Sequence, residues 1–336
     1  MDKPLQPPKS APKPGAGVQT VTVKADEDGM RLDRFFEARF PGLSFSHIQR
    51  IIRKGEVRVN GKRAEPKDRI KSGQSIRVPP LKIEAPKPKD DAPQGNKDRA
   101  FIKSITLFED DDVMVLNKPM GLSVQGGSGT YKHIDGMLDA LQGKKRQRPR
   151  LVHRLDGDTS GVIVVARTVP AAASLSEALR HRDAQKIYWA LTKGVPKPHR
   201  GVIKLALAKE SGFGRQGQDE RMAPAEADEE GAKSATTYYA VMGTAADAYA
   251  WVALKPITGR THQLRVHCQA MGWPILGDPI YGDGRETGEM LHLHARAIEV
   301  PLYKNKAPIK AAAPVPAHMR DLLRACGLNL EPGTGD

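Results

Sequence analysis

The chain contains little cysteine. Its 336 residues include only Cys268 and Cys326, which lie far apart and match no zinc-ligand spacing. We therefore expect reduced thiols in a reducing compartment and no metal site. No apolar run reaches the length of a membrane span, and the first residues, MDKPLQPPKSAPKPGAG, lack the apolar segment of a signal peptide. These absences predict a cytoplasmic protein.

Acidic residues are too few to balance the basic ones. There are 53 Lys and Arg residues against 39 Asp and Glu residues, which gives a net charge of +14. Such a surplus favours a polyanionic partner, and nucleic acid is the first candidate. Charge alone does not separate an enzyme from a structural RNA-binding protein, so evidence for an activity has to come from motifs.

Composition divides the chain into two patterned regions. Residues 1–18 are rich in Pro, Lys and Gly and have little to bury, which predicts a disordered basic tail. A similar stretch at 82–98 predicts a linker between a small domain at 19–81 and a larger one at 99–325. Residues 326–336 are then a C-terminal tail.

The small region shows helical and hairpin patterns. Leu32, Phe35 and Phe36 are spaced as in one helix, and Ile48 to Ile52 continue the pattern in a second. Asn60-Gly61 predicts a tight turn between short strands. Residues 31–71 hold twelve Lys or Arg against five Asp or Glu, so we expect phosphate contacts. The predicted RNA-binding residues on or beside the second helix are Arg50, Arg53, Lys54, Arg58 and Lys62.

This region resembles the S4-type RNA-binding domain. The resemblance rests on RLDRFF, LSFSHIQRIIRKGEVRVNGKR and KSGQSIRV. It implies that the small domain binds RNA.

The larger region alternates strand-like apolar runs with fewer helical ones, which predicts an α+β domain around a sheet. Two patterns in it look functional but are better explained otherwise. GFGRQG at 212–217 matches a dinucleotide-binding pattern, yet a polar stretch follows where a helix should open, so we interpret it as a loop. His292 and His294 could face one side of a strand and bind a metal there, but no third ligand is apparent. We therefore interpret them as two strand histidines that each have a hydrogen-bond partner within the fold.

The stretch LVHRLDGDTSGV at 151–162 interrupts apolar runs with a polar cluster. Arg154 and Asp156 are two residues apart, so in an extended segment they project to the same face. Lys118 and Arg265 belong to similar basic segments that follow other strands, and these segments suggest an anionic ligand held around one carboxylate. An arginine neighbour would keep such a carboxylate ionised, which suits a nucleophile or a base.

These segments together resemble the RluA family of pseudouridine synthases. The matches are HRLDxxTSG, K-P-x-G, K-x-Y-x-A and TGRTHQLRVH, and they occur in the family's order. With the S4-type domain in front, the chain is most similar to the RluC branch, which acts on large-subunit ribosomal RNA. The resemblance implies a catalytic domain around a central, mainly antiparallel sheet.

The resemblance also implies roles for individual residues. Asp156 would be the catalytic aspartate, Arg260 its salt-bridge partner, and Tyr188 the ring that stacks on the target base and takes part in proton transfer. Arg154 would enter the RNA where the uridine has left, and Lys118 and Arg265 would contact RNA. The implied substrate is 23S ribosomal RNA or a large-subunit precursor. The implied enzyme is a monomer, and it needs no cofactor because the reaction has no redox step.

Other function classes fit less well. A glycoside hydrolase normally needs two carboxylates flanking the bond, and Asp156 and Asp158 are close in sequence. A base deaminase needs H-x-E with P-C-x-x-C, and neither is present. The alternative that remains is an RNA-binding ribosome assembly factor without catalytic activity.

Overall fold

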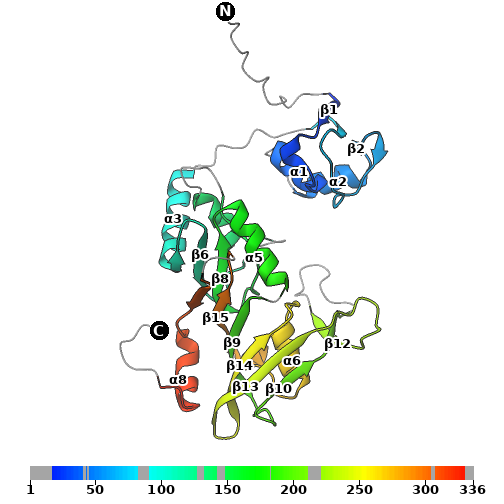
Figure 1. The fold of residues 1–336 in the computed structure, drawn as a ribbon. Coiled ribbons are helices and arrows are strands. Elements are labelled where there is room, and N and C mark those ends of the chain that lie inside the picture. Colours follow the sequence, from blue (N-terminus) through cyan, green and yellow to red (C-terminus); the bar gives the residue numbers. More distant parts are fainter. Residues whose placement is uncertain are drawn as a thin grey trace, which may run out of the picture. The chain divides into compact units, whose positions relative to one another are not determined.

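The computed structural model divides the chain into two compact units, residues 1–91 and 92–336 (Figure 1). The structure describes residues 17–40, 43, 45–81, 91–126, 132–141, 148–181, 183–210, 221–303 and 307–329.

The first unit is a small four-stranded sheet packed against two helices. Its strands pair antiparallel in the order β1-β4-β2-β3. Leu32, Phe35 and Phe36 are buried on one face of α1 and pack against Ile48 and Ile52 from α2, which confirms the predicted helical spacing. The elements are β1 (Gln19–Thr22), η1 (Ala25–Glu27), α1 (Leu32–Arg39), α2 (Phe45–Arg53), β2 (Arg58–Val59), β3 (Lys62–Arg63) and β4 (Ser75–Val78).

The tight turn predicted at Asn60-Gly61 joins β2 to β3. Both residues have positive φ, 48° and 77°, which is the conformation of a two-residue hairpin loop. The Asn60 side chain also accepts a hydrogen bond from the backbone N–H of Ser75, 2.8 Å away.

The second unit is built around one large, mainly antiparallel sheet, as predicted. The strand order is β10-β13-β14-β9-β15-β8-β6-β5, with β16 beside β15 and β7 beside β8. Within the described residues, β8 with β15 is the one parallel pair of strands. The strands are β5 (Thr106–Glu109), β6 (Val113–Lys118), β7 (Arg150–Leu151), β8 (Ser160–Ala166), β9 (Gln185–Lys193), β10 (Arg200–Lys204), β13 (Thr236–Ala245), β14 (Tyr249–Pro256), β15 (Leu293–Val300) and β16 (Ile309–Ala312).

Helices cover both faces of the sheet around β6 and β8 (Figure 1). Val162 and Val164 pack on one face with α5, while Ile163 and Val165 pack on the other with α3 and α4. A small sheet of β11 (Ala206–Lys209) and β12 (Met222–Ala225) completes the strands. The helices are α3 (Asp91–Ser104), α4 (Ile134–Met137), η2 (Leu138–Leu141), α5 (Val169–His181), α6 (Gln263–Ala270), α7 (Gly284–Thr287) and α8 (Ala317–Ala325).

A glycine allows the close contact between β8 and β15. Gly161 has φ of 110°, and a Cβ added there would lie 2.2 Å from the carbonyl oxygen of Ala295. Any side chain would therefore push the two strands apart. Next to this contact, the Ser160 hydroxyl lies 2.9 Å from Nδ1 of His294, which joins the same two strands through their side chains.

The structure differs from the expected boundaries at both ends of the second unit. Helix α3 begins at Asp91, so it occupies the last eight residues of the predicted linker at 82–98. The sequence did not predict this helix, because Pro93 and Gly95 are typical of linkers. Proline is nevertheless tolerated in a first helical turn. At the other end, Cys326 and Leu328 of the predicted tail pack against α8 and its neighbours. In the described part of the chain, no helix has the length and apolar character needed to cross a bilayer.

Candidate active site

The segment His153 to Asp156 leads into the turn before β8. Nε2 of His153 accepts a hydrogen bond from the backbone N–H of Val164, at 2.9 Å. Burial, with a further contribution from the charge of Lys186, lowers the pKa of His153 to about 3, so the ring is neutral and able to accept this bond. Leu155 is buried in the core beneath. These two anchors leave Arg154 and Asp156 lining the same pocket.

Lys118 holds the far side of this turn. Its ammonium group is fully buried and donates hydrogen bonds to the carbonyls of Pro119, Leu122 and Gly157, at 3.0, 2.8 and 2.8 Å. Burial lowers the pKa of Lys118 to about 8, against the opposing charges of Asp158 and Asp156. The prediction that Lys118 binds RNA is therefore wrong, because its three protons are used inside the protein.

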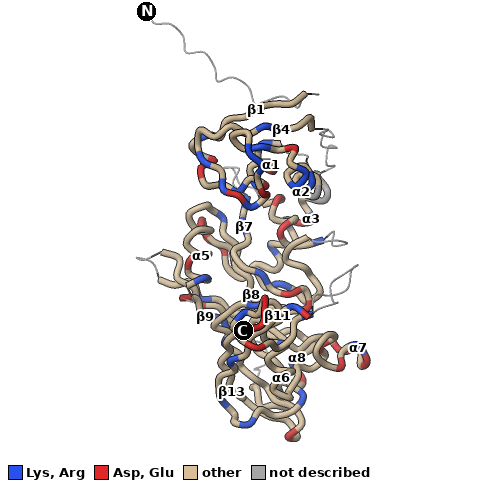
Figure 2. The backbone as a smooth tube through the Cα atoms, turned by 90° about the vertical axis from the view of Figure 1, so that its right-hand side faces the viewer, with Lys and Arg blue, Asp and Glu red and all other residues tan. Residues whose placement is uncertain are grey.

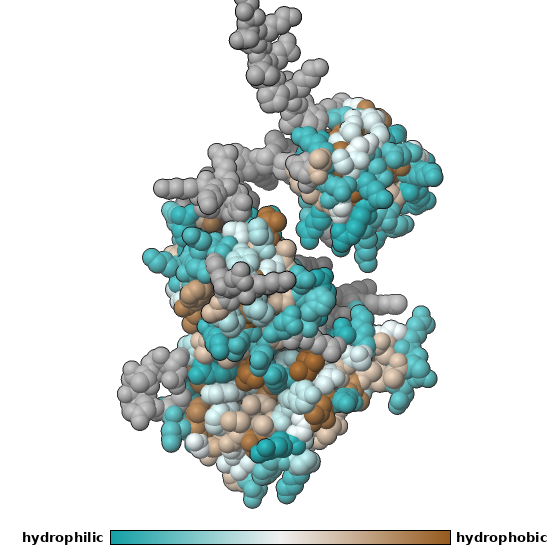
Figure 3. Space-filling view, in the orientation of Figure 1, coloured by the Kyte–Doolittle hydropathy of each residue, from teal (hydrophilic) through white to brown (hydrophobic). Residues whose placement is uncertain are grey.

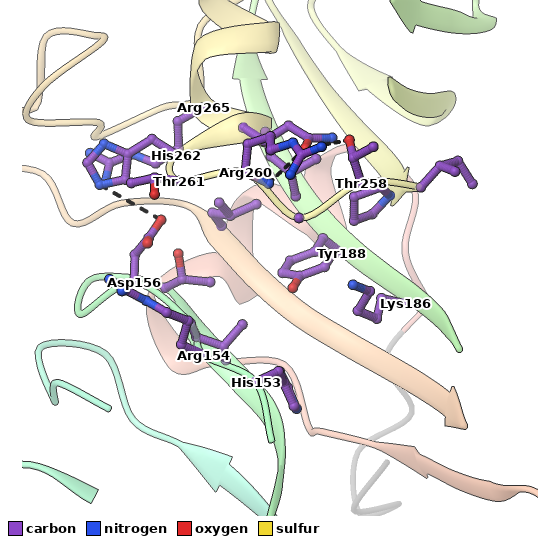
Figure 4. A pocket seen from close by; sticks show the side chains of 18 of the residues that line it. His153, Arg154, Asp156, Lys186, Tyr188, Thr258, Arg260, Thr261, His262 and Arg265 are labelled. Carbon is purple, nitrogen blue, oxygen red and sulfur yellow. Dashed lines mark hydrogen bonds and ion pairs between the residues drawn. The ribbon is translucent and has the colours of Figure 1, made fainter. Parts of the chain in front are cut away.

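The pocket has a volume of about 470 Å³ and draws on distant parts of the chain (Figure 4). Its wall includes the loop around Asp156, the end of α5, the start of β9 and the segment leading into α6. The charged, histidine or tyrosine residues that line it are His153, Arg154, Asp156, Arg180, Lys186, Tyr188, Arg260, His262 and Arg265.

Tyr188 comes from β9 and points into the pocket in Figure 4. Burial raises its pKa above the usual value of 10, and the negative charge of Asp156 adds to this effect. The phenol is therefore protonated at neutral pH. Tyr188 can donate a hydrogen bond and offer a ring face, but it does not act as a phenolate base.

Arg260 does not form the predicted ion pair with Asp156. Its Nε donates to the carbonyl of Ser234 at 3.2 Å, and its backbone N–H donates to the Gln263 side chain at 3.0 Å. Among the described residues, the basic group in contact with the Asp156 carboxylate is instead His262, whose Nε2 lies 4.0 Å from Oδ2. Sequence reasoning included His262 in a motif but assigned it no role.

Arg265 is also placed differently from the prediction. Its guanidinium is buried and forms two hydrogen bonds with Asp278, Nε to Oδ2 at 2.8 Å and Nη2 to Oδ1 at 2.7 Å. Asp278 is buried as well, yet these bonds, the arginine's charge and backbone N–H donors keep the pKa of its carboxyl below the usual value. The prediction that Arg265 contacts RNA is wrong, because the arginine is part of a buried pair.

Lys186 is a second pocket residue for which the sequence suggested no separate role. Burial lowers the pKa of its ammonium group. Within the described residues, no hydrogen bond or ion pair is formed by this group, which points into the pocket near Tyr188 (Figure 4). This amino group is thus available to a ligand.

His294 in β15 and His292, which precedes this strand, both have hydrogen-bond partners, as predicted. His294 contacts Ser160, and Nδ1 of His292 lies 2.7 Å from the carbonyl oxygen of Met290. Among the described residues there is no group of three or more potential metal ligands. The GFGRQG segment at 212–217 lies outside the described residues.

The predicted RNA-binding side chains of the first unit are exposed. Arg50 and Arg53 belong to α2, and Lys54 follows it. Arg58 and Lys62 lie on the hairpin of β2 and β3. Lys and Arg residues lie along and beside α2 in Figure 2, and the face of this unit seen in Figure 3 is largely hydrophilic.

Comparison with known proteins agrees with this arrangement. The RNA pseudouridylate synthase family matches residues 112–270, and the S4 domain matches residues 30–76. Ribosomal large subunit pseudouridine synthase C of Salmonella typhi is 40% identical over 298 residues, covering 84% of this chain and 88% of the relative. The protein of the same name from Haemophilus ducreyi is 38% identical over 320 residues, covering 92% and 95%.

A solved structure supports the same conclusion. Human RNA pseudouridylate synthase domain containing 4 matches with a TM-score of 0.58 and 29% identity, over 70% of this chain and 98% of that chain. Both the motifs and the fold therefore agree with the resemblance found in the sequence. The chain belongs to the RluA family of RNA pseudouridine synthases and carries an S4 domain in front of its catalytic domain.

Proposed function

We propose that this enzyme converts uridines of 23S ribosomal RNA to pseudouridine, with Asp156 acting at the ribose. The observation that carries the proposal is the carboxylate of Asp156, the one carboxylate among the described residues that line the pocket, which also contains Tyr188. The relatives named as large-subunit pseudouridine synthases support this choice of RNA.

The pocket suits an extruded nucleotide. Its volume of about 470 Å³ falls within the range of roughly 300 to 1,000 Å³ typical of small-ligand sites. A base in folded RNA has to leave its stack to reach such a pocket, at a cost of a few kcal/mol. Arg154 is exposed at the pocket, where it can occupy the space that the base leaves and offset part of this cost.

The reaction is an isomerisation, so its atoms balance without a co-reactant. The bond from C1′ of the ribose to N1 of uracil breaks, the ring turns, a bond from C1′ to C5 forms, and the proton on C5 moves to N1. Asp156 assists either by attacking C1′ or by removing the C2′ proton to form a glycal. The buried, protonated Tyr188 lies against the ring and helps to retain it until the new bond forms.

The surrounding charges hold the RNA. Arg154, Arg180 and Arg260 are exposed at the pocket and carry no carboxylate partner among the described residues. Together with the basic first unit, they supply salt-dependent binding to phosphates. We further propose that one copy of the chain suffices, because every group that the chemistry needs comes from one chain. We also propose that the protein works in the cytoplasm, a reducing compartment that suits its free cysteines, Cys268 and Cys326.

The test uses purified protein and transcribed 23S ribosomal RNA. Pseudouridine is detected by carbodiimide labelling and primer extension. We expect wild-type protein to produce specific stops, and Asp156→Asn to abolish them while RNA binding persists. Asp158→Asn is the matched control, because it removes a carboxylate from the same turn without changing the pocket wall. It should retain the stops.

Two outcomes would overturn parts of the proposal. Unchanged labelling by Asp156→Asn would remove the role of Asp156. Tight RNA binding by wild-type protein, without pseudouridine in transcribed RNA or in a large-subunit precursor, would favour an RNA-binding assembly factor instead.

A further inference from the structure

The closest contact of Asp156 with a basic side chain involves a histidine. Nε2 of His262 and Oδ2 of Asp156 are 4.0 Å apart, and their side chains are 11% and 25% exposed. Figure 4 shows the two groups facing each other across the pocket wall. A hydrogen bond between them needs an approach of about 1 Å.

The backbone fixes the place of His262. It is the residue before α6 and adopts the left-handed conformation, with φ of 52° and ψ of 16°. The next residue, Gln263, is buried, and its side chain donates to the Thr236 carbonyl and to the Thr237 hydroxyl, both at 3.0 Å. The loop that carries His262 is therefore tied to β13.

The ring of His262 is held by Tyr281. Nδ1 lies 3.0 Å from the Tyr281 hydroxyl, and the two rings meet edge to face at 5.6 Å. That hydroxyl accepts a hydrogen bond from the backbone N–H of Met222 at 2.9 Å. Tyr281 is itself fixed, because its backbone N–H donates to Asp278 and the guanidinium of Arg265 lies 5.3 Å from its ring centre.

This chain of contacts favours one tautomer of His262. The Tyr281 oxygen accepts from Met222, and the hydroxyl can direct its own hydrogen at Nδ1 of the neutral imidazole. The neutral ring then carries its proton on Nε2. If the ring is charged, Nε2 is again protonated. In both states an N–H group faces the carboxylate, whereas the other tautomer would direct a lone pair at it.

We propose that His262 is the positioning residue for Asp156, with its Nε2–H directed at Oδ2 by Tyr281, so that Oδ1 is left to act on the ribose. This inference rests on the proposed function. It gives His262 the orienting task that was expected of Arg260, which binds the carbonyl of Ser234 instead. It also explains the buried pair of Arg265 and Asp278, which supports Tyr281 from behind.

The test compares His262→Leu, His262→Gln and Tyr281→Phe in the full-length protein under single-turnover conditions with transcribed 23S RNA. A misplaced reacting group costs on the order of 100-fold in rate, which is the loss expected for His262→Leu, with little change in RNA affinity. His262→Gln should recover most of the rate, because the glutamine amide can supply an N–H near the position of Nε2. Tyr281→Phe should lose less, and the double variant His262→Leu/Tyr281→Phe should be no slower than His262→Leu.

The matched control is His292→Leu, which removes a similarly buried histidine that contacts Met290 instead of the pocket. It should keep the wild-type rate. A rate for His262→Leu within threefold of wild type, or no recovery by glutamine, would overturn the inference. Additive losses in the double variant would show that Tyr281 does not act through His262.

A second readout does not depend on activity. In protein labelled with ¹⁵N-histidine, the His262 signal, assigned by its loss in His262→Gln, should show a protonated Nε2 and should change in Tyr281→Phe. An Nδ1-protonated ring would overturn the inference even if no variant were active. Wild-type protein that shows the expected tautomer but forms no pseudouridine would instead contradict the proposed function.

Discussion

Arg265→Met distinguishes a structural arginine from an RNA-binding one. The side chains of Arg265 and Asp278 are 2% and 0% exposed, so the substitution leaves a buried carboxylate without its cation. Removing one partner of a buried ion pair typically costs about 3 to 5 kcal/mol in the free energy of unfolding. For a unit of this size, that corresponds to a fall in melting temperature of roughly 6 to 20 °C.

Urea unfolding followed by tryptophan fluorescence measures this loss in the full-length protein. All of the tryptophans, Trp189, Trp251 and Trp273, belong to the second unit, so the signal reports that unit alone. The double variant Arg265→Met/Asp278→Asn should recover part of the stability, because the neutral amide oxygen can still accept the N–H groups of residues 280 and 281. The exposed Arg200→Met is the control and should change the free energy of unfolding by less than about 0.5 kcal/mol.

The opposite result would refute this reasoning. A phosphate-binding arginine could be replaced with little change in stability, but the slope of log K for RNA against log salt would fall by about 1. If Arg265→Met behaves in this way, the buried pair is not what holds Tyr281 in place, and the support inferred for His262 fails with it.

Two further predictions concern pH and salt. Burial is the main cause that lowers the pKa values of His153, His267 and His294 from 6.5 to about 3, 4 and 4, so the unfolded chain takes up their protons first. These histidines do not change the stability above pH 6.5. As the pH drops from 6.5 toward 4, the free energy of unfolding of the second unit should fall by up to about 1.4 kcal/mol per pH unit for each histidine. Urea midpoints that stay constant over this range would contradict the prediction. In the first unit, Arg53→Ala/Lys54→Ala should lower the slope of log K against log salt by about 2. Arg34→Ala, whose arginine already pairs with Glu37, should leave that slope unchanged, and equal slopes for all three proteins would rule out phosphate contacts from the end of α2.

Local patterns predicted the elements that have one clear period. The helical spacing of Leu32, Phe35 and Phe36 led to α1, and the apolar run after Ser160 led to β8. The boundary at 98 was wrong because Pro93 and Gly95 resemble linker residues, whereas the helix is stabilised by packing that involves Ile102. Intrinsic preference is a weak guide when tertiary packing decides.

The predicted roles of basic residues failed where burial decided the outcome. A lysine in the sequence is expected on the surface, so nothing in the K-P-x-G segment shows that three carbonyls surround Lys118. For Arg265 a signal did exist, since the family segment that contains Asp278 follows thirteen residues later, but their pairing depends on the fold. The contact between His262 and Asp156 also depends on the fold, because the two residues are more than a hundred positions apart. The left-handed conformation of His262 helps to bring its ring near Asp156.

The motif residues therefore divide into a few that face the ligand and more that hold them in place. Asp156 lies on a loop, and a displacement of about 1 Å can cost 100-fold in rate. Lys118 fixes the carbonyl of Gly157 on one side of Asp156, while His153 ties the preceding segment to β8. Gly161 allows β8 to approach β15 closely enough for this frame to form. Without these supports the carboxylate would still be present, but its oxygens would not be held at one position, which is why so many motif residues surround a single reacting group.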